Sequence, residues 1–195
     1  MRAIMATITE TEAVLSDEHI NEFKFCPECG SKNIQTKAGT HWTCPDCGYD
    51  LYNNNAAAVG LFLVVRGKLL VFRRVKDPQK GRLGLPGGFV NKGESLEEAC
   101  IRECREEIGI TPPAFEYLCS FPNTYPYKTL VYSTCDAFFY AEYNGSEEEL
   151  LAGIKTVDGE AENCQLVPLA TLDTSEIAFE SMRKAVKILR NRIKI

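Results

Sequence analysis

The sequence, 195 residues long, has little that marks a membrane-bound or secreted protein. Its longest apolar run, Ala56–Val65, has ten residues, whereas a membrane-spanning helix needs about 20. We therefore expect no membrane partner. The first fifteen residues include Glu10 and contain no continuous apolar segment followed by a cleavage site, which is unlike a secretory signal. From this we expect a cytoplasmic protein.

The sequence also lacks an excess of positive charge and an even number of cysteines. The chain has 22 Lys and Arg against 27 Asp and Glu, a net charge of −5, so its overall field does not favour a nucleic acid as partner. The nine cysteines are an odd number, which argues against a fully paired disulfide framework. In a cytoplasmic protein, clustered cysteines are more often metal ligands or buried apolar side chains.

What is present predicts a globular chain of three segments. Residues 1–24 form a polar N-terminal extension, in which Val14, Leu15 and Ile20 favour a short helix. Residues 25–52 are rich in Cys and Gly and too few to hold a core unaided. After the three asparagines at 53–55 the pattern changes, and residues 56–195 form the larger domain.

Hydrophobic patterning in the larger domain predicts a mixed sheet flanked by helices, an α/β (α+β) fold. Runs of β-branched and aromatic residues predict strands over 56–65, 68–74, 115–121, 130–143 and 165–169. A turn at Arg66 and Gly67 joins the first two of them. Helical periodicity predicts helices over 96–108 and 175–192. The second helix has an apolar stripe formed by Ile177, Met182, Val186 and Leu189.

Two short cysteine motifs predict a zinc site. Cys26-Pro-Glu-Cys29-Gly and Cys44-Pro-Asp-Cys47-Gly repeat one pattern, separated by fourteen residues, and each places two thiolates across a tight turn. Four thiolates complete a tetrahedral Zn²⁺ site and leave no position for water, so the zinc is expected to be structural. The segment resembles the zinc ribbons of many small domains. We interpret His41, between the motifs, as a spare polar residue, and the other cysteines as core residues: Cys100, Cys104, Cys119, Cys135 and Cys164.

The predicted helix over 96–108 carries a cluster of carboxylates. Ser95 with Glu98 forms a capping box that begins the helix, and Gly109 is a fitting residue to end it. The i, i+3 and i+4 spacing brings three glutamates to one helix face, Glu103, Glu106 and Glu107. Carboxylates this close repel one another unless a cation lies among them, and Mg²⁺ or Mn²⁺ is the natural partner. Just upstream, Gly87 and Gly88 let the backbone approach a metal or a phosphate closely.

This segment matches the Nudix box, G-x₅-E-x₇-R-E-U-x-E-E-x-G-U with U apolar, over residues 88–110. The matching residues are Gly88, Glu94, Arg102, Glu103, Glu106, Glu107, Gly109 and Ile110, and Cys104 stands where the family usually has an aliphatic residue. The resemblance spans about residues 56–195 and implies the family's α/β/α sandwich with a mixed sheet, preceded here by a small zinc ribbon.

The resemblance also implies hydrolysis of a nucleoside diphosphate linked to another group. Glu103, Glu106 and Glu107 would then ligate Mg²⁺ or Mn²⁺ with support from Glu94, and Arg102 would hold a carboxylate in place. The metals would neutralise developing charge on the pyrophosphate and lower the pKa of an attacking water. Glu107 or another nearby carboxylate would act as general base. Some members take a further ligand or base from a later loop, for which the candidates are Glu160 and Glu162. Family members often form dimers, so a homodimer is expected on the same ground.

Sequence features downstream of the box leave the substrate open. A zinc ribbon upstream of the box is similar to the arrangement in NADH pyrophosphatases, and residues 120–127 keep the Ser and Pro of those enzymes' S-Q-P-W-x-F-P-x-S element but lack its Trp. Pro126 is similar to the proline marker of ADP-ribose pyrophosphatases, and Tyr127 to the tyrosine of diadenosine polyphosphate hydrolases. Phe121, Tyr125 and Tyr127 could stack on a base, although such aromatics also serve in packing.

Three functions therefore compete. The first is a Mg²⁺-dependent pyrophosphohydrolase acting on a dinucleotide such as NADH or on ADP-ribose. The second is a regulator whose zinc ribbon binds nucleic acid and whose Nudix domain senses a nucleotide; against it, residues 25–52 contain only Lys32 and Lys37 as basic residues, balanced by Glu28, Asp46 and Asp50. The third, a Nudix-fold isomerase of allylic diphosphates, has no specific support in the sequence.

Overall fold

A computed structural model describes residues 24–37, 41–128, 130–155 and 161–194 of the chain. The chain forms two compact units, residues 1–53 and 54–195, and each is described by itself. The short helix predicted around Val14, Leu15 and Ile20 lies outside the described residues.

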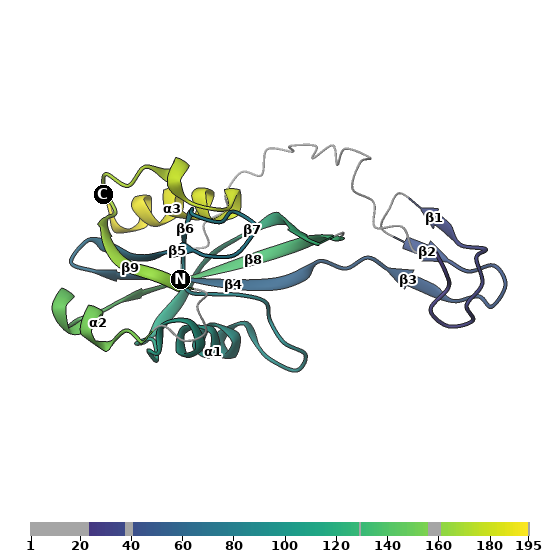
Figure 1. The fold of residues 1–195 in the computed structure, drawn as a ribbon, viewed down its shortest axis with the longest axis horizontal. Coiled ribbons are helices and arrows are strands. Elements are labelled where there is room, and N and C mark those ends of the chain that lie inside the picture. The colour runs from purple at the N-terminus through teal and green to yellow at the C-terminus, as the bar shows by residue number, and fades with distance from the viewer. Residues whose placement is uncertain (1–23, 38–40, 129, 156–160, 195) are drawn as a thin grey trace. The chain divides into compact units, whose positions relative to one another are not determined.

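The smaller unit contains a three-stranded antiparallel sheet (Figure 1). Its strands are β1 (Gln35–Lys37), β2 (His41–Thr43) and β3 (Asp50–Tyr52), in the order β1-β2-β3. Its buried side chains include Trp42, Cys26 and Cys44. Strands of three residues are too short to give a periodic pattern, so the sequence did not predict them.

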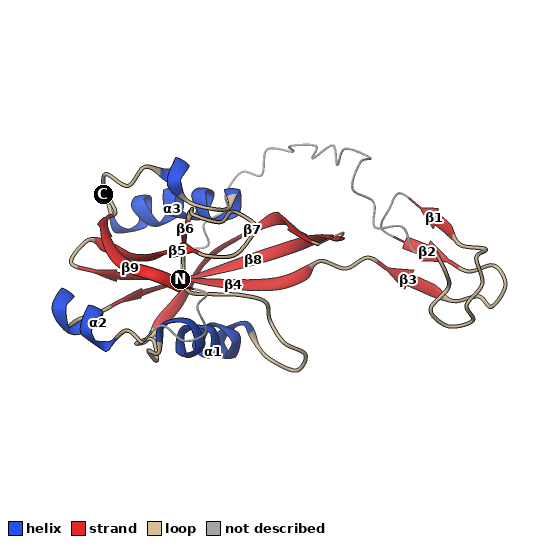
Figure 2. Ribbon diagram, in the orientation of Figure 1, coloured by secondary structure: helices blue, strands red, loops and turns tan. Residues whose placement is uncertain are grey.

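The larger unit is built on a mixed six-stranded sheet, as the sequence predicts (Figure 2). The strands are β4 (Ala56–Val65), β5 (Lys68–Arg74), β6 (Leu83–Gly84), β7 (Phe115–Tyr127), β8 (Leu130–Glu142) and β9 (Ala161–Pro168). Five of them follow the order β6-β5-β4-β8-β7, and β9 pairs with β5. The β4–β8 pair is parallel and the other pairs are antiparallel. The predicted turn between β4 and β5 is confirmed: Arg66 and Gly67 both have positive φ, as a two-residue hairpin requires.

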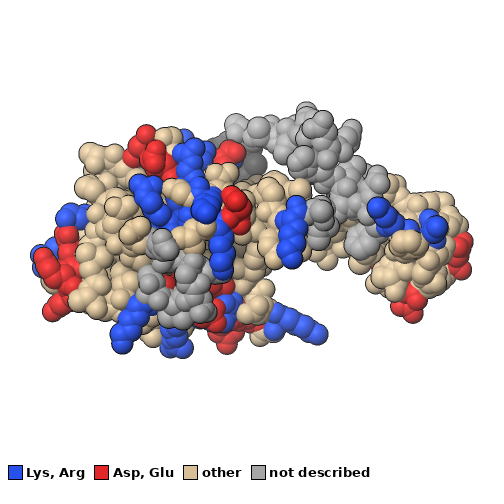
Figure 3. All heavy atoms as spheres, in the orientation of Figure 1, with Lys and Arg blue, Asp and Glu red and all other residues tan. Residues whose placement is uncertain are grey.

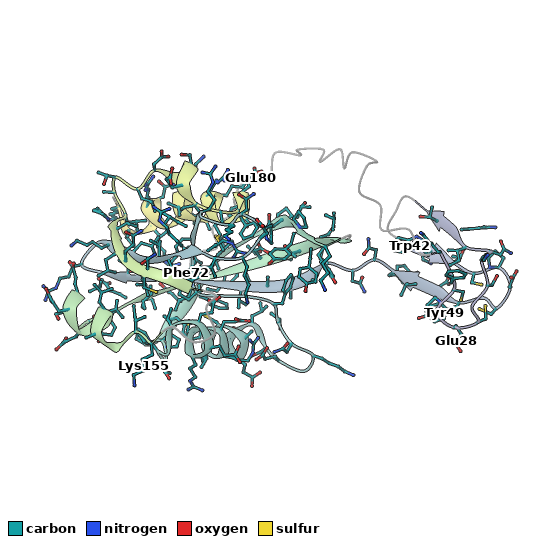
Figure 4. All side chains as sticks on the ribbon, viewed as in Figure 1. Glu28, Trp42, Tyr49, Phe72, Lys155 and Glu180 are labelled. Atoms are coloured by element: carbon teal, nitrogen blue, oxygen red, sulfur yellow. The ribbon has the colours of Figure 1, made fainter. Side chains whose placement is uncertain are left out.

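Helices cover both faces of this sheet, which confirms the predicted sandwich (Figure 1). α1 (Leu96–Ile108) packs on one face and α3 (Glu180–Ile193) on the other, and the short α2 (Glu147–Gly153) adds Leu150 to the α1 side. β4 is buried on both faces because its side chains alternate between two cores. Leu61, Leu63 and Val65 pack with α1, whereas Phe62 and Val64 pack with α3. Figure 4 shows the side chains that fill the space on either side of the sheet.

Several predicted boundaries were wrong. The strand predicted over 115–121 continues to Tyr127, because β8 pairs with it as far as Tyr127 opposite Leu130. The last helix begins at Glu180 rather than at 175, because Ile177 bridges Leu83 at the sheet and the Ala178 N–H donates to Leu83 O at 2.9 Å. The last strand begins at Ala161 rather than at 165, since β9 pairs with β5 from that residue.

The short elements β6 and α2 were not predicted, having two and seven residues. Of the five cysteines predicted to be core residues, Cys100 and Cys104 are buried, while Cys119 and Cys164 are half-buried. Cys135 is exposed, and strand alternation directs its side chain to the opposite face of β8 from its buried neighbours Thr134 and Asp136.

Candidate functional site

The helix α1 has the bounds and caps that the sequence predicts. The Glu98 N–H donates to Ser95 Oγ at 3.2 Å, and the Ser95 N–H donates to the Glu98 carboxylate at 2.8 Å. Gly109 ends the helix in the left-handed conformation, with a φ of 70°. These local contacts fix where the helix starts and stops, and so fix which of its side chains point the same way.

The loop before α1 runs along the first half of β4. The Val59 N–H donates to Gly88 O at 2.9 Å, and the Leu61 N–H donates to Pro86 O at 2.8 Å. Sterics require a glycine at position 87, because a Cβ there would lie 2.1 Å from the backbone oxygen Val59 O. A Cβ on Gly88 would lie 2.5 Å from a carboxylate oxygen of Glu103, so a larger residue there would displace that side chain. The loop can therefore approach β4 this closely only with Gly87, and Gly88 leaves room for the Glu103 carboxylate.

Arg102 gathers the carboxylates that surround it. Its Nε and Nη2 donate to the two oxygens of Glu94 at 2.7 and 2.9 Å, and its Nη1 donates to Glu103 at 2.7 Å and to Glu106 at 2.9 Å. Nη2 also donates to the carbonyl oxygen of Phe89 at 2.9 Å. The five donors of the guanidinium are thus engaged. The predicted pairing of Arg102 with a carboxylate is present in the structure, and it ties the acidic helix to the loop.

These hydrogen bonds shift the ionisation of both partners. The Arg102 guanidinium, followed by the backbone N–H of Asn91, holds the pKa of the Glu94 carboxyl below its ordinary value. The same contact with Glu94 raises the pKa of Arg102, against the opposing effect of partial burial. Both groups therefore stay charged at neutral pH.

The three glutamates of the acidic face differ in position. Glu107 is buried, and its Oε2 accepts a hydrogen bond from the Gly87 N–H at 2.8 Å. The side chain of Glu103 is 14% exposed and that of Glu106 is 58% exposed. Glu103 and Glu107 line a cavity of the larger unit, whereas Glu106 lies at the surface against Arg102. The structure thus brings two of the three predicted metal ligands to one cavity.

That cavity has a volume of about 460 Å³, which is large enough for a nucleotide. Its walls combine carboxylates, two cationic side chains and several aromatic rings, including Glu103, Glu107, Asp136, Asp77, Arg74, Lys76, Phe89, Tyr125, Tyr127 and Phe179. Tyr125 is central to the aromatic wall. Its ring centroid lies 5.7 Å from that of Phe179 and 5.2 Å from that of Phe89.

Most of the predicted substrate contacts line this cavity, namely Gly87, Gly88, Tyr125 and Tyr127. Phe121 does not, because it packs against the core on the α3 side of the sheet. Glu160 lies outside the described residues, and Glu162 is described only as part of the backbone of β9.

Several cavity residues were missed by sequence reasoning, among them Arg74, Asp136 and Phe179. Arg74 lies at the end of β5, with its guanidinium carbon 5.0 Å from the centre of the Phe179 ring and its Nε donating to Pro78 O at 3.0 Å. Phe179 stands just before α3 and Asp136 in the middle of β8. Asp136 carried a usable signal, since a carboxylate directly before the apolar residues 137–139 of a strand requires partners.

The four cysteines of the smaller unit form a potential metal site. Their sulfur atoms lie within 4.8 Å of one another, and the Cys26–Cys47 and Cys29–Cys44 pairs are each separated by 3.7 Å. Figure 4 shows sulfur atoms gathered near Tyr49 and Glu28. Four sulfurs placed about 2.3 Å from a central Zn²⁺ would be about 3.8 Å apart. The spacing of the thiols therefore fits a zinc ion.

The two cysteine motifs fold alike. In each, the glycine N–H donates to the carbonyl oxygen of the first cysteine, Gly30 to Cys26 at 2.9 Å and Gly48 to Cys44 at 2.8 Å. Both glycines have positive φ, 73° and 75°, the conformation that relieves a chain doubling back. His41 is not in the group; its Nε2 lies 3.2 Å from Asp50, and its ring stacks on Tyr52.

The surface of the larger unit carries charges of both signs (Figure 3). On the visible face of the larger unit, Lys and Arg side chains are interspersed with Asp and Glu (Figure 3). In the part of the chain that the structure describes, no helix has the length and apolar character needed to cross a membrane.

Comparison with known proteins identifies the family. A model of the NUDIX domain matches residues 54–187. The ADP-ribose pyrophosphatase of Methanocaldococcus jannaschii is 33% identical over 137 residues, which cover 69% of this chain and 78% of that protein. The NAD-capped RNA hydrolase NudC of Stutzerimonas stutzeri is 31% identical over 129 residues, covering 66% of this chain but only 44% of the relative. The chain thus aligns with less than half of the length of that hydrolase.

Solved structures share the fold. A NUDIX hydrolase from Nitrosomonas europaea has a TM-score of 0.62 at 22% identity, covering 88% of this chain and 93% of that chain. The NUDIX domain of Shewanella oneidensis NrtR, solved in complex with ADP ribose, has a TM-score of 0.59 at 22% identity, covering 73% of this chain and 90% of that chain. These structures share the fold of the larger unit, and the NUDIX domain model over residues 54–187 shows that the chain belongs to the Nudix family.

Proposed function

We propose that residues 56–195 form a divalent-metal-dependent pyrophosphohydrolase that cleaves a nucleoside diphosphate linked to another moiety. ADP-ribose or a dinucleotide such as NADH is the proposed substrate. One observation carries the proposal: two carboxylates of the acidic helix, Glu103 and Glu107, line the same cavity as an aromatic wall that suits a nucleobase. The names of the two relatives, which refer to ADP-ribose and to NAD-capped RNA, support this substrate class.

The acidic face of α1 suits a hard cation. Its donors are carboxylate oxygens, the ligands that Mg²⁺ and Mn²⁺ prefer. A Cβ on Gly88 would lie 2.5 Å from the Glu103 carboxylate, so the glycine leaves the space beside that carboxylate open. The proposed ligands are Glu103, Glu106 and Glu107, with support from Glu94. When bound, the cation would neutralise the pyrophosphate oxygens and lower the pKa of an attacking water.

The remaining residues of the site position these groups. Arg102 holds Glu94, Glu103 and Glu106 through its hydrogen bonds and so restricts their rotation. The Gly87 N–H fixes Glu107 by a hydrogen bond of 2.8 Å. Glu107 or another carboxylate nearby then accepts a proton from the water that attacks phosphorus. Tyr125 and Tyr127 are proposed to contact the nucleoside.

For the smaller unit we propose a structural zinc ribbon over residues 25–52. Cys26, Cys29, Cys44 and Cys47 would supply all four ligands, which leaves no open position for chemistry at the metal. The described residues of this unit form three strands of three residues and bury few apolar side chains, so the metal would supply much of its folding free energy.

The experiment incubates the full chain with Mg²⁺ or Mn²⁺ and a panel of ADP-ribose, NADH, NAD⁺, NAD-capped RNA, diadenosine polyphosphates and nucleoside triphosphates. Products are identified by chromatography. We expect metal-dependent release of AMP with ribose 5-phosphate from ADP-ribose, or of AMP with the reduced nicotinamide mononucleotide from NADH. Hydrolysis of triphosphates alone would contradict the proposed substrate class. If the protein binds a dinucleotide but hydrolyses it with neither Mg²⁺ nor Mn²⁺, the proposed enzymatic activity is contradicted and a nucleotide sensor is favoured. Light scattering on the same sample tests the homodimer that family resemblance implies.

A further inference from the structure

One carboxylate in the cavity lies apart from the acidic face of α1. Asp136, on β8, lines the cavity and is only 7% exposed. Its Oδ1 accepts a hydrogen bond from Thr134 Oγ1 at 2.6 Å, and its Oδ2 accepts one from Ser181 Oγ at 2.6 Å. Thr134 and Ser181 are themselves buried. The two hydroxyl groups therefore hold the carboxylate in one orientation.

No cation balances this carboxylate within the described parts of the chain. The ion pairs of those residues do not include Asp136. Arg74, which lines the same cavity, instead donates to Pro78 O and lies over the ring of Phe179. An ionised carboxylate has about four lone-pair sites, and two hydroxyl donors use about half of them. Burying a charged carboxylate with unused lone-pair sites costs free energy unless a further hydrogen-bond donor reaches it.

A purely structural bridge would not need the charge. Hydroxyl groups both donate and accept, so an asparagine at position 136 would connect Thr134 with Ser181 equally well. The packing of α3 on the sheet depends mainly on apolar side chains, among them Ala185, Val186 and Leu189. The negative charge is therefore best explained by what enters the cavity.

The neighbouring rings indicate what kind of donor this is. Phe179 and Tyr125 line the cavity with their planes 35° apart and their centroids separated by 5.7 Å. Phe179 is buried and Arg74 lies over its ring, whereas Tyr125 is half-buried and offers a ring on which a flat base can stack. A carboxylate beside a stacked base accepts from an exocyclic amine and repels a carbonyl oxygen in the same place. In ADP-ribose the one such amine belongs to adenine.

We propose that Asp136 is a specificity-determining residue that accepts a hydrogen bond from the exocyclic amine of adenine. This inference rests on the proposed function and adds to it the feature that selects the base. Thr134 and Ser181 are positioning residues, because they act on the substrate through Asp136. A hypoxanthine base, which carries a carbonyl oxygen where adenine carries the amine, is then disfavoured.

The test compares ADP-ribose with inosine diphosphate ribose, using kcat/KM in Mg²⁺ for the wild type, Asp136→Asn and Glu142→Gln. Glu142 is a matched control because it is an exposed carboxylate on the same strand. We expect the wild type to prefer the adenine substrate by about ten- to a hundredfold, the worth of a hydrogen bond to a charged group. In Asp136→Asn the preference falls to within about threefold, because an amide can also donate to the carbonyl oxygen. Glu142→Gln keeps the wild-type preference.

A binding measurement separates this inference from the proposed function. Calorimetry with AMP and IMP measures base preference without turnover, and Ser181→Ala provides a second variant if Asp136→Asn does not fold. Lack of hydrolysis by the wild type would overturn the proposed function, while a preference for AMP that Asp136→Asn or Ser181→Ala weakens would still support Asp136. Equal affinity of the wild type for AMP and IMP would overturn the inference. The inference would also be overturned if a variant with unchanged Tm lost affinity for AMP and for IMP to the same extent.

Discussion

The close approach of the glycine loop to β4 makes Gly87→Ala a severe test of the site's construction. The new Cβ would lie 2.1 Å from Val59 O and 2.7 Å from Gly60 Cα, both backbone atoms that cannot rotate away. The φ of Gly87 is also +151°, which an L-residue rarely adopts. The loop must therefore leave β4 to accommodate the methyl group.

The expected loss follows from the hydrogen bonds that hold the loop. Two backbone bonds to β4, from Val59 and Leu61, each contribute about 0.5–1.5 kcal/mol, and the bond from the Gly87 N–H to the Glu107 carboxylate about 1.5–3 kcal/mol. Gly87→Ala should therefore destabilise the larger unit by about 2.5–6 kcal/mol. For a unit of this size the Tm should fall by about 10–20 °C. Hydrolysis should fall as well, because Glu107 loses the donor that orients it.

Gly67→Ala is the matched control. Gly67 also has a positive φ, 74°, but a Cβ there would meet nothing within 4 Å. Its replacement should cost only the strain of the left-handed conformation, about 1–2 kcal/mol. Thermal unfolding of both variants, followed by circular dichroism, checks the difference. Equal Tm values for the two variants would refute the account of how the loop is held.

Two further predictions concern Arg102 and the cysteines. Arg102→Met should return the pKa of the Glu94 carboxyl, which Arg102 lowers, toward its ordinary value, as carbon-detected NMR titration can measure. A lowered carboxyl pKa stabilises the fold at pH values above the unfolded-state pKa, and this gain is lost as the pH falls through the folded-state pKa. Arg102→Met should therefore lose more stability at neutral pH than below about pH 3. A loss of stability that is independent of pH would argue against the pairing of Arg102 with Glu94. Cys26→Ser should lower the zinc content measured by atomic absorption and shift the emission of Trp42 to the red, since this single tryptophan is buried in the smaller unit. Full zinc content and unchanged Trp42 emission in Cys26→Ser would contradict the proposed zinc ribbon.

Local signals in the sequence predicted the acidic helix well. Ser95, Glu98 and Gly109 set its ends through contacts within a few residues, so its bounds agree with the structure. The cysteine motifs are equally local, since each glycine accommodates the turn around its own pair of cysteines. Features of this kind depend on the chain's immediate neighbours and can be recognised from spacing alone.

Long-range pairing determined what the sequence did not predict. Tyr125 and Tyr127 belong to a strand only because β8 pairs with β7 to its end. Asp136 reaches the cavity because β8 lies parallel to β4, and its partner Ser181 lies 45 residues further along the chain. Phe121, on the same strand as Tyr125, was predicted to contact the substrate but instead packs under α3, because the cavity ends before it. Contacts between distant segments leave no mark in local periodicity.

Glu107→Gln tests most directly whether the acidic face of α1 performs metal-dependent hydrolysis. Glutamine has nearly the same shape and can still accept from the Gly87 N–H, so the fold should persist while the charge is lost. The control is Glu97→Gln, an exposed glutamate in the first turn of the same helix. With ADP-ribose and Mg²⁺, we predict that kcat falls at least about a hundredfold in Glu107→Gln and is unchanged in Glu97→Gln. Retention of full activity by a folded Glu107→Gln protein would contradict the account.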